Sequence, residues 1–155
     1  MTQSASGPAR FFEDVSEGER TKTGSFTFTT ESIVAFAAQY DPQPMHLDAE
    51  AGKASFFKAQ VASGWQTLGV TMRLMVDAHP FGTTPLIGLQ IDEIRFAHPV
   101  YPGDTVTAEL EITGKRASKS RPDRGFLTGK TITLNQDGKE VLSQLWTMLM
   151  PVRGS

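Results

Sequence analysis

The sequence predicts an α+β domain in which an antiparallel sheet wraps around one buried helix. Helical patterns fall in the first half of the chain, and consecutive strand patterns fall in the second half. Between them, the segment from Ser63 to Pro80 is apolar on most sides of a helical wheel, so we expect a helix that other elements surround. The chain has 155 residues, of which 39% are hydrophobic, and this suffices for one core.

The first half of the chain is expected to contain a short strand and then helix. Residues 25–29 alternate between apolar and polar side chains, as in a half-buried strand. Thr30 is a suitable N-cap for a helix whose apolar residues recur at helical spacing up to Tyr40. The prolines that follow cannot continue this helix, so they end it. A weaker helical stretch is expected from Asp48 to about Lys58.

Four strands are expected in the second half. The alternation changes phase within residues 89–96, which predicts a bulge near residues 92–93. Residues 105–113 alternate regularly, and residues 126–134 form a third strand that a turn signal ends. Residues 141–150 are apolar on both faces, which predicts a central strand that is covered on both sides.

Composition excludes several classes of function. The formal net charge is -2, so the sequence shows no electrostatic signature of binding to nucleic acid or to an anionic membrane. The chain has no cysteine, which excludes disulfides, thiolate metal sites and a cysteine nucleophile. The three histidines, His46, His79 and His98, lack the spacing of metal ligands, so we expect no metal site.

The sequence shows no targeting segment. Residues 1–10 are small and polar, so we expect a flexible N-terminus that lacks the apolar region of a secretory signal. The longest strongly apolar run, near residues 145–152, is far shorter than the roughly 20 residues that a membrane helix needs. No linker divides the chain. We therefore expect a cytoplasmic protein with one domain.

The link YDPQPMH, from Tyr40 to His46, places an acid and a histidine in a stiff segment. Its prolines fix their own φ angles and favour extended geometry in the residues that precede them. Such a turn can hold the Asp41 carboxylate and the His46 imidazole at one point, where the pair can position a water and move protons. Asp-Pro is equally a common turn opener, so a purely structural role stays open.

The start of the buried helix is a second candidate site. Ser63 is expected to be the N-cap, and Gly64 allows a ligand to approach the backbone closely. Free N–H groups at a helix start favour an anion, and a developing oxyanion is an anion. The alternative is that the Ser-Gly pair merely opens the helix.

A cluster of positive charge is the third candidate. It is formed by Lys115, Arg116, Lys119, Arg121 and Arg124. Such a cluster is usually a solvated loop, although five cations can also bind a phosphate. The GxSxG, GxGxxG, HExxH and Walker motifs are absent from the sequence.

Three segments carry a resemblance to a known family: TTESIVAFAAQYDPQPMHLDAEAGKASFF, VASGWQTLGVTMRLM and HPVYPGDTV. They resemble the MaoC-like dehydratases, the (R)-specific enoyl-CoA hydratase branch of the hotdog-fold proteins. The resemblance runs from about Phe11 to Val152. It implies a single hotdog domain over residues 11–152, in which an antiparallel sheet wraps around a long central helix.

The resemblance also implies roles for individual residues. The catalytic aspartate and histidine of the family fall on Asp41 and His46, and the backbone N–H that binds the thioester carbonyl oxygen falls on Gly64. Gln43 stands in place of an asparagine and Ser63 in place of a histidine. The resemblance therefore does not determine the geometry around the substrate. The residues expected to bind substrate are Tyr40, Gln43, Ser63, Trp65, Arg121 and Arg124, with the two arginines placed at the phosphates of coenzyme A.

The reaction that the resemblance implies is the reversible hydration of a 2-enoyl thioester to a 3-hydroxyacyl thioester. It needs no metal or redox cofactor, since coenzyme A would be part of the substrate. Two alternatives are an acyl-CoA thioesterase on the same fold and a non-catalytic subunit that binds acyl thioesters. The resemblance further implies a homodimer or higher homo-oligomer, with which the apolar last strand is compatible, although that strand could equally be an interior one.

Overall fold

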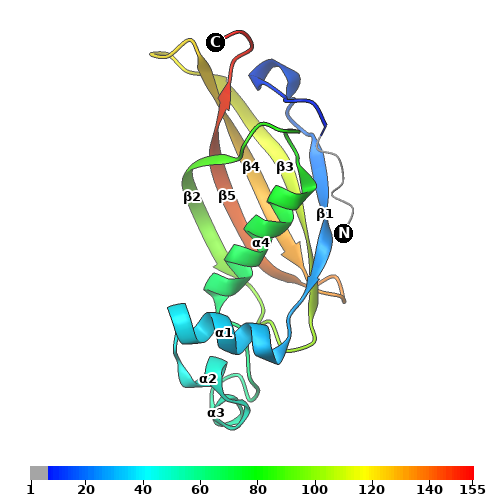
Figure 1. Cartoon of the computed structure of the whole chain (residues 1–155), viewed down its shortest axis with the longest axis vertical. Helices are drawn as coiled ribbons and strands as arrows, with labels where there is room; N and C mark the ends of the chain where they lie inside the picture. The colour runs from blue at the N-terminus through cyan, green and yellow to red at the C-terminus, as the bar shows by residue number, and fades with distance from the viewer. Residues whose placement is uncertain (1–6) are drawn as a thin grey trace.

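The computed structural model describes residues 7–155, in which five antiparallel strands curve around one long helix (Figure 1). The strands lie in the order β1-β3-β4-β5-β2. Their bounds are Arg20–Thr27 for β1, Ile87–Phe96 for β2, Thr105–Ala117 for β3, Arg124–Leu134 for β4 and Glu140–Pro151 for β5. This arrangement confirms the predicted α+β hotdog fold.

Helix α4 (Gly64–Ala78) lies across the concave face of the sheet. Its side chains Leu74 and Met75 are buried in the core, and Thr71 Oγ1 lies 2.7 Å from Thr133 Oγ1 of β4. The prediction that other elements surround this helix is wrong for the single chain. A stripe of apolar side chains on α4 stays exposed, and it consists of Trp65, Met72 and Val76. An apolar sequence pattern predicts that a helix face is buried, but it does not identify the residues that bury it.

Strand β2 forms one edge of the sheet, and all ten of its residues are exposed. The predicted bulge is confirmed, because the pairing with β5 shifts between Asp92 and Arg95. Glu93 occupies this shift with a positive φ of 52°, a left-handed conformation that is uncommon outside glycine. The bulge bends β2 locally at the edge of the sheet.

Strand β5 lies inside the sheet, between β4 and β2, which confirms the prediction of a central strand. Its concave face is buried, as Trp146 and Met148 show. The predicted cover on the other face is wrong, because Leu145 and Leu149 are only half-buried there. No second layer of the described chain packs on that side of the sheet.

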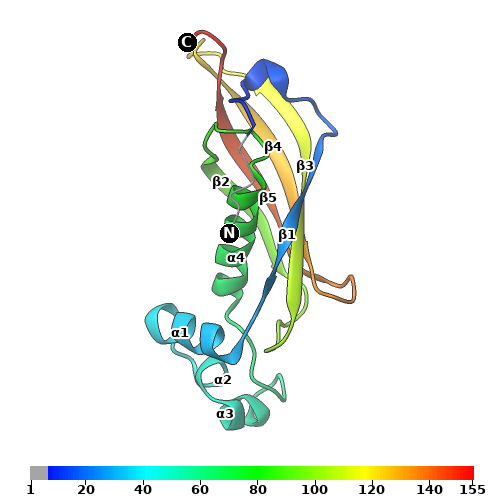
Figure 2. The same cartoon turned by 45° about the vertical axis from the view of Figure 1, so that its right-hand side comes forward.

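Three shorter helices gather beyond the N-terminal end of α4 (Figure 2). They are α1 (Thr30–Tyr40), α2 (Pro44–Leu47) and α3 (Ala49–Ala54). Thr29 caps α1 in place of the predicted Thr30, because the Thr29 backbone is extended and its Oγ1 accepts from Ser32 N–H at 3.1 Å. The stretch predicted to be helical up to Lys58 ends at Ala54. None of the helices within residues 7–155 has the length and apolar character needed to cross a membrane.

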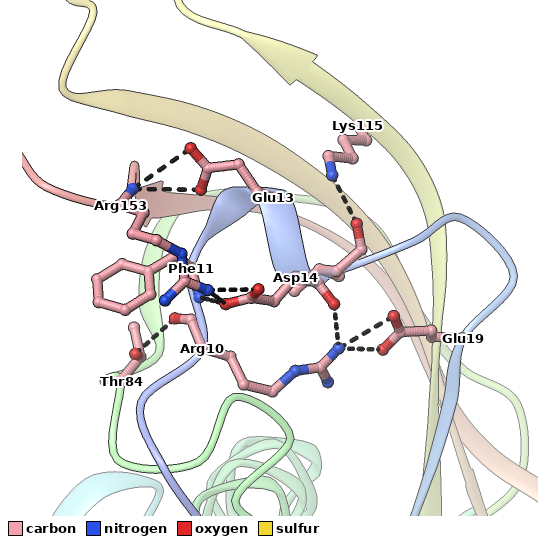
Figure 3. Close-up of polar contacts among 9 residues, drawn as sticks. Arg10, Phe11, Glu13, Asp14, Glu19, Thr84, Lys115 and Arg153 are labelled. Carbon is pink, nitrogen blue, oxygen red and sulfur yellow. Dashed lines mark hydrogen bonds and ion pairs between the residues drawn. The ribbon is translucent and has the colours of Figure 1, made fainter.

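The N-terminal segment is fastened at the other end of the sheet (Figure 3). Residues 1–6 of the part expected to be flexible lie outside the described residues. The Arg10 backbone N–H donates to Phe81 O at 3.2 Å, and the Arg10 guanidinium donates to Glu19 at 2.9 Å. Asp14, in the short 3-10 helix Phe12–Asp14, pairs with Arg153 near the C-terminus. The N-terminal segment therefore lies at the end of the sheet opposite to α1–α3.

Candidate active site

The proline-rich link brings Asp41 and His46 together. Helix α1 ends at Tyr40, and Asp41 closes it by donating its backbone N–H to Ala37 O at 2.9 Å. Pro44 then occupies the first position of α2, where a missing N–H costs nothing, and His46 follows within that single turn. As a result, Asp41 Oδ2 lies 3.3 Å from His46 Nε2.

The His46 ring is buried and held in one orientation. Its Nδ1 lies 2.7 Å from Val61 O, and a carbonyl oxygen can only accept, so Nδ1 carries a hydrogen. Gln60 Nε2 also donates to the His46 carbonyl oxygen at 2.9 Å, which fixes the backbone. Nε2 of the neutral ring therefore carries only a lone pair, which can accept from a water beside the Asp41 carboxylate, and Nε2 of the protonated ring can donate to the carboxylate directly.

The Asp41 carboxylate receives hydrogen bonds on both oxygens. Gln43 Nε2 donates to Oδ1 at 2.7 Å, and Ser63 Oγ donates to Oδ2 at 2.7 Å. Burial raises the pKa of Asp41, but the hydrogen bonds from Ser63 and Gln43, with the charge of His46, outweigh it and hold the pKa below its ordinary value of 3.8. The carboxylate is thus ionised near neutral pH and can act as a base.

The start of α4 presents a free donor beside this carboxylate. Ser63 is the N-cap, as predicted, and its Oγ accepts from Trp65 N–H at 3.2 Å. Gln66 and Thr67 donate their N–H groups to Ser63 O. Within the described part of the chain, no group accepts from the Gly64 N–H, which therefore points its hydrogen and the positive end of the helix dipole at any ligand.

Glycine at position 64 allows a close contact with Phe96 that a side chain would disturb. A Cβ atom there would lie 2.7 Å from the Phe96 ring, closer than real Cβ contacts come. The glycine therefore allows the Phe96 ring to pack against the start of α4. The structure thus places an ionised carboxylate, an imidazole and a free N–H in the lining of one pocket.

A pocket of about 460 Å³ opens at this point, and Asp41, His46 and Gly64 all line it. The rest of its wall is mainly apolar and includes Met45, Phe56, Phe57, Trp65, Phe96 and Val141. A pocket with a few polar groups at one place and apolar walls elsewhere suits an apolar ligand whose reacting group must be oriented. Among the described residues, no group of histidine, aspartate and glutamate side chains could hold a metal ion.

The structure places only some of the other predicted site residues at the pocket. Gln43 and Trp65 line the pocket, whereas Tyr40 is 70% exposed and lies outside its lining. Arg121 lies in the loop between β3 and β4, and Arg124 begins β4, at the opposite end of the sheet from α1–α3 (Figure 1). Arg124 is moreover paired with Asp123 through two hydrogen bonds of 2.8 Å. Within one chain, the structure does not bring these two arginines to the pocket.

Phe56, Phe57 and His98 are among the residues of the pocket wall that were not predicted from the sequence. Phe56 and Phe57 follow α3, and Phe56 is 92% exposed although it lines the pocket. The sequence did contain a signal for these two residues, because adjacent aromatic side chains are unusual in such a small and polar segment. His98 also lines the pocket, with its Nδ1 fixed 2.7 Å from Glu140 O. No local pattern pointed to His98, because its position depends on the pairing of β2 with β5.

The chain is similar in sequence to a known family and to several known proteins. A family model described as "MaoC like domain" matches residues 12–133. The uncharacterised protein YdeM of Bacillus subtilis is 33% identical over 124 residues, which cover 80% of this chain and 85% of the relative. An (R)-specific enoyl-CoA hydratase of Rhodospirillum rubrum is 28% identical over 145 residues, which cover 93% of this chain and 94% of the relative.

Solved structures agree with the sequence comparison. The crystal structure of a MaoC-like dehydratase from Rhodospirillum rubrum matches with a TM-score of 0.85 and 36% identity, covering 94% of this chain and 99% of that one. The structure of an (R)-hydratase from A. caviae that is involved in PHA biosynthesis matches with a TM-score of 0.74 and 25% identity, covering 90% of this chain and 99% of that one.

Proposed function

The chain belongs to the MaoC-like domain family, and from that premise we propose that it catalyses the reversible hydration of a 2-enoyl-CoA to a 3-hydroxyacyl-CoA. The observation that carries the proposal is the Asp41–His46 pair, 3.3 Å apart, beside the free N–H of Gly64 in one pocket. The (R)-specific enoyl-CoA hydratase among the relatives supports the same reaction.

The Asp41–His46 pair would handle the two protons of the reaction. A water held between Asp41 Oδ2 and His46 Nε2 adds its oxygen to C3 of the enoyl group while one of its protons passes to the Asp41 carboxylate. The proton that C2 gains comes from the same pair, so the pair returns to its starting state after each turnover. Because the pKa of Asp41 lies below its ordinary value, the carboxylate is ready to act without prior loss of a proton.

Gly64 would stabilise the negative charge that builds on the thioester oxygen. As water attacks C3, electrons move to this oxygen and create an enolate-like transition state. An N–H at the start of α4 is fixed in position before the reaction and meets the charge as it forms. Removal of one such donor in other enzymes costs about 3–4 kcal/mol. The apolar walls of the pocket would hold the acyl chain.

The proposed partner is a second copy of the chain. Strand β2 is an unpaired edge, and its exposed apolar residues are Ile87, Leu89, Ile91, Ile94 and Phe96. The exposed stripe of α4 lies on the same side, since Trp65 shares a pocket with Phe96 and Val76 shares one with Leu86. An antiparallel edge strand can pair with its own copy about a two-fold axis, which would cover this surface.

The reaction is tested by the loss of enoyl absorbance with crotonyl-CoA and with a longer enoyl-CoA. We expect wild type to turn over and folded Asp41→Asn and His46→Ala to lose about 100-fold or more in kcat, because each removes a proton-handling group. Asp137→Asn, an exposed aspartate of the turn between β4 and β5, is the matched control and should keep full activity.

Two other results would contradict the proposal. Release of free thiol from a saturated acyl-CoA, with no change in enoyl absorbance, would indicate a thioesterase. Tight acyl-CoA binding without turnover over a broad range of enoyl chain lengths would indicate a binding subunit.

A further inference from the structure

Ser63 lies behind the wall of the pocket. Its side chain is 0% exposed, and the pocket is lined by its neighbours Ala62 and Gly64 but not by Ser63 itself. The Ser63 hydroxyl donates to Asp41 Oδ2 at 2.7 Å, while its oxygen accepts from Trp65 N–H at 3.2 Å. Ser63 therefore joins the catalytic carboxylate directly to the first turn of α4.

We propose that Ser63 is a positioning residue, which holds the Asp41 carboxylate at the reacting water and makes no contact with the substrate. The inference rests on the proposed hydratase function and replaces the expectation that Ser63 binds substrate. Since Ser63 is fixed as the N-cap of α4, its bond to Asp41 sets the separation between the carboxylate and the Gly64 N–H.

That separation matters for the chemistry. The carboxylate acts at C3 of the enoyl group, and the Gly64 N–H acts at the thioester oxygen, so one rigid substrate must meet both groups at once. A misplacement of reacting groups by about 1 Å can cost roughly 100-fold in rate. Gln43, which lies on the exposed link and holds only Oδ1, supplies no connection to α4.

The hydroxyl of Ser63 also sets the charge state of the base. A donor to a carboxylate favours the ionised form, so removing the Ser63 hydroxyl raises the pKa of Asp41. The other titratable groups that face this carboxylate across the pocket are His46 of α2 and His98 after β2. Neither ring is bonded to Ser63, since His46 Nδ1 contacts Val61 O and His98 Nδ1 contacts Glu140 O, so a shift in the titration of Asp41 reports on Ser63.

Two substitutions separate this role from helix capping. Ser63→Gly removes the hydroxyl but keeps a residue that caps helices almost as well, at a cost of only a few tenths of a kcal/mol. Ser63→Thr keeps the hydroxyl at the same place. Thr29→Ala is the matched control, because it removes the N-cap hydroxyl of α1, which bonds only within its own turn.

The first readout is the pKa of the Asp41 carboxyl group, followed by carbon-13 NMR in the full chain and assigned with Asp41→Asn. The second is the dependence of kcat/KM on pH. We expect Ser63→Gly to raise the pKa of Asp41, to move the acid limb of kcat/KM to higher pH, and to lower kcat/KM on that limb by about 10-fold. Ser63→Thr, which keeps the donor to Asp41, should keep the Asp41 pKa close to that of wild type, and Thr29→Ala should behave as wild type does in both measurements.

An unchanged Asp41 titration and acid limb in folded Ser63→Gly would overturn the inference, and so would a Ser63→Thr variant that shifts as far as Ser63→Gly. If wild type has no hydratase activity, the proposed function fails while the NMR titration still decides whether Ser63 holds Asp41.

Discussion

The Asp41 carboxylate is held from both of its oxygens, by Gln43 on one and by Ser63 on the other. These are two of the positions where the sequence departs from the pattern of the family it resembles, the third being Tyr40 in place of a glycine, and from sequence alone their effect on the substrate was open. In the structure, both side chains contact the base. The sequence could name Asp41 and His46 because a stiff local link joins them. It could not assign Ser63 to Asp41, because that contact spans 22 positions and depends on how α4 meets α1.

Gln43→Glu should lower the ionised fraction of Asp41 in a way that depends on pH. The substitution removes the donor to Asp41 Oδ1 and places a second carboxylate beside it, and both effects raise the pKa of Asp41. Less of Asp41 is then ionised at acidic pH. We expect kcat/KM to fall by about 10-fold near the acid limb and the deficit to shrink as the pH rises, measured by enoyl absorbance across pH.

Gln136→Glu is the matched control for that substitution. Gln136 Nε2 donates to Asp104 Oδ1 at 2.8 Å, so the same change creates the same pair of acids away from the pocket. Its pH profile should match that of wild type. A Gln43→Glu deficit that is equal at every pH would show that Gln43 acts on geometry alone.

At the scale of elements, local signals were predicted well and long-range pairing was not. The end of α1 at Tyr40 follows from two prolines, and the bulge of β2 follows from a change of phase within ten residues. The position of β2 beside β5 follows from neither, because a strand's partner is set by packing far away in sequence. That pairing is what brings Phe96 and His98 to the pocket.

The start of α4 should not tolerate a side chain at position 64. In Gly64→Ala, the new Cβ would lie 2.7 Å from the ring of Phe96, a residue that lines the pocket, so the ring or the helix start must shift. We expect kcat/KM to fall by about 100-fold, since a shift of about 1 Å at the reacting groups costs this much. Steady-state kinetics and circular dichroism on the same samples would separate lost activity from lost fold.

Gly24→Ala in β1 is the control for added bulk at a glycine, because nothing lies within 4 Å of its Cβ. It should keep the kcat/KM of wild type. Full activity in Gly64→Ala would mean that the space in front of the α4 N–H is not used by the substrate.

At the scale of the whole molecule, one surface of the chain has the character of an interior. The exposed apolar residues of β2 adjoin the exposed stripe of α4, in which Trp65 is 63% exposed. This explains why α4 has the apolar pattern of an enclosed helix although the single chain leaves one side open. From the sequence, the last strand, β5, was compatible either with a dimer contact or with an interior position. In the structure, β5 lies inside the sheet and β2 forms the edge.

Ile91→Lys should weaken the proposed dimer. Ile91 is 45% exposed on the edge strand and is paired with Trp146, whose side chain is buried on the concave face, so it lies on the side of the sheet that faces α4. Pairing of β2 with its own copy would bring two introduced ammonium groups into one apolar interface, and each is costly to bury without a partner. We expect wild type to be a dimer by light scattering after gel filtration at micromolar concentration, and Ile91→Lys to be largely monomeric.

The control for added charge is Ser25→Lys on β1, the opposite edge of the sheet, where the same side chain should leave the dimer intact. Because Phe96 and Trp65 contribute to both the pocket and the exposed surface, a monomeric variant should also bind acyl-CoA more weakly, through a higher KM. A wild-type monomer, or a dimer that survives Ile91→Lys and is lost in Ser25→Lys, would place the contact elsewhere and leave the apolar pattern of α4 without this explanation.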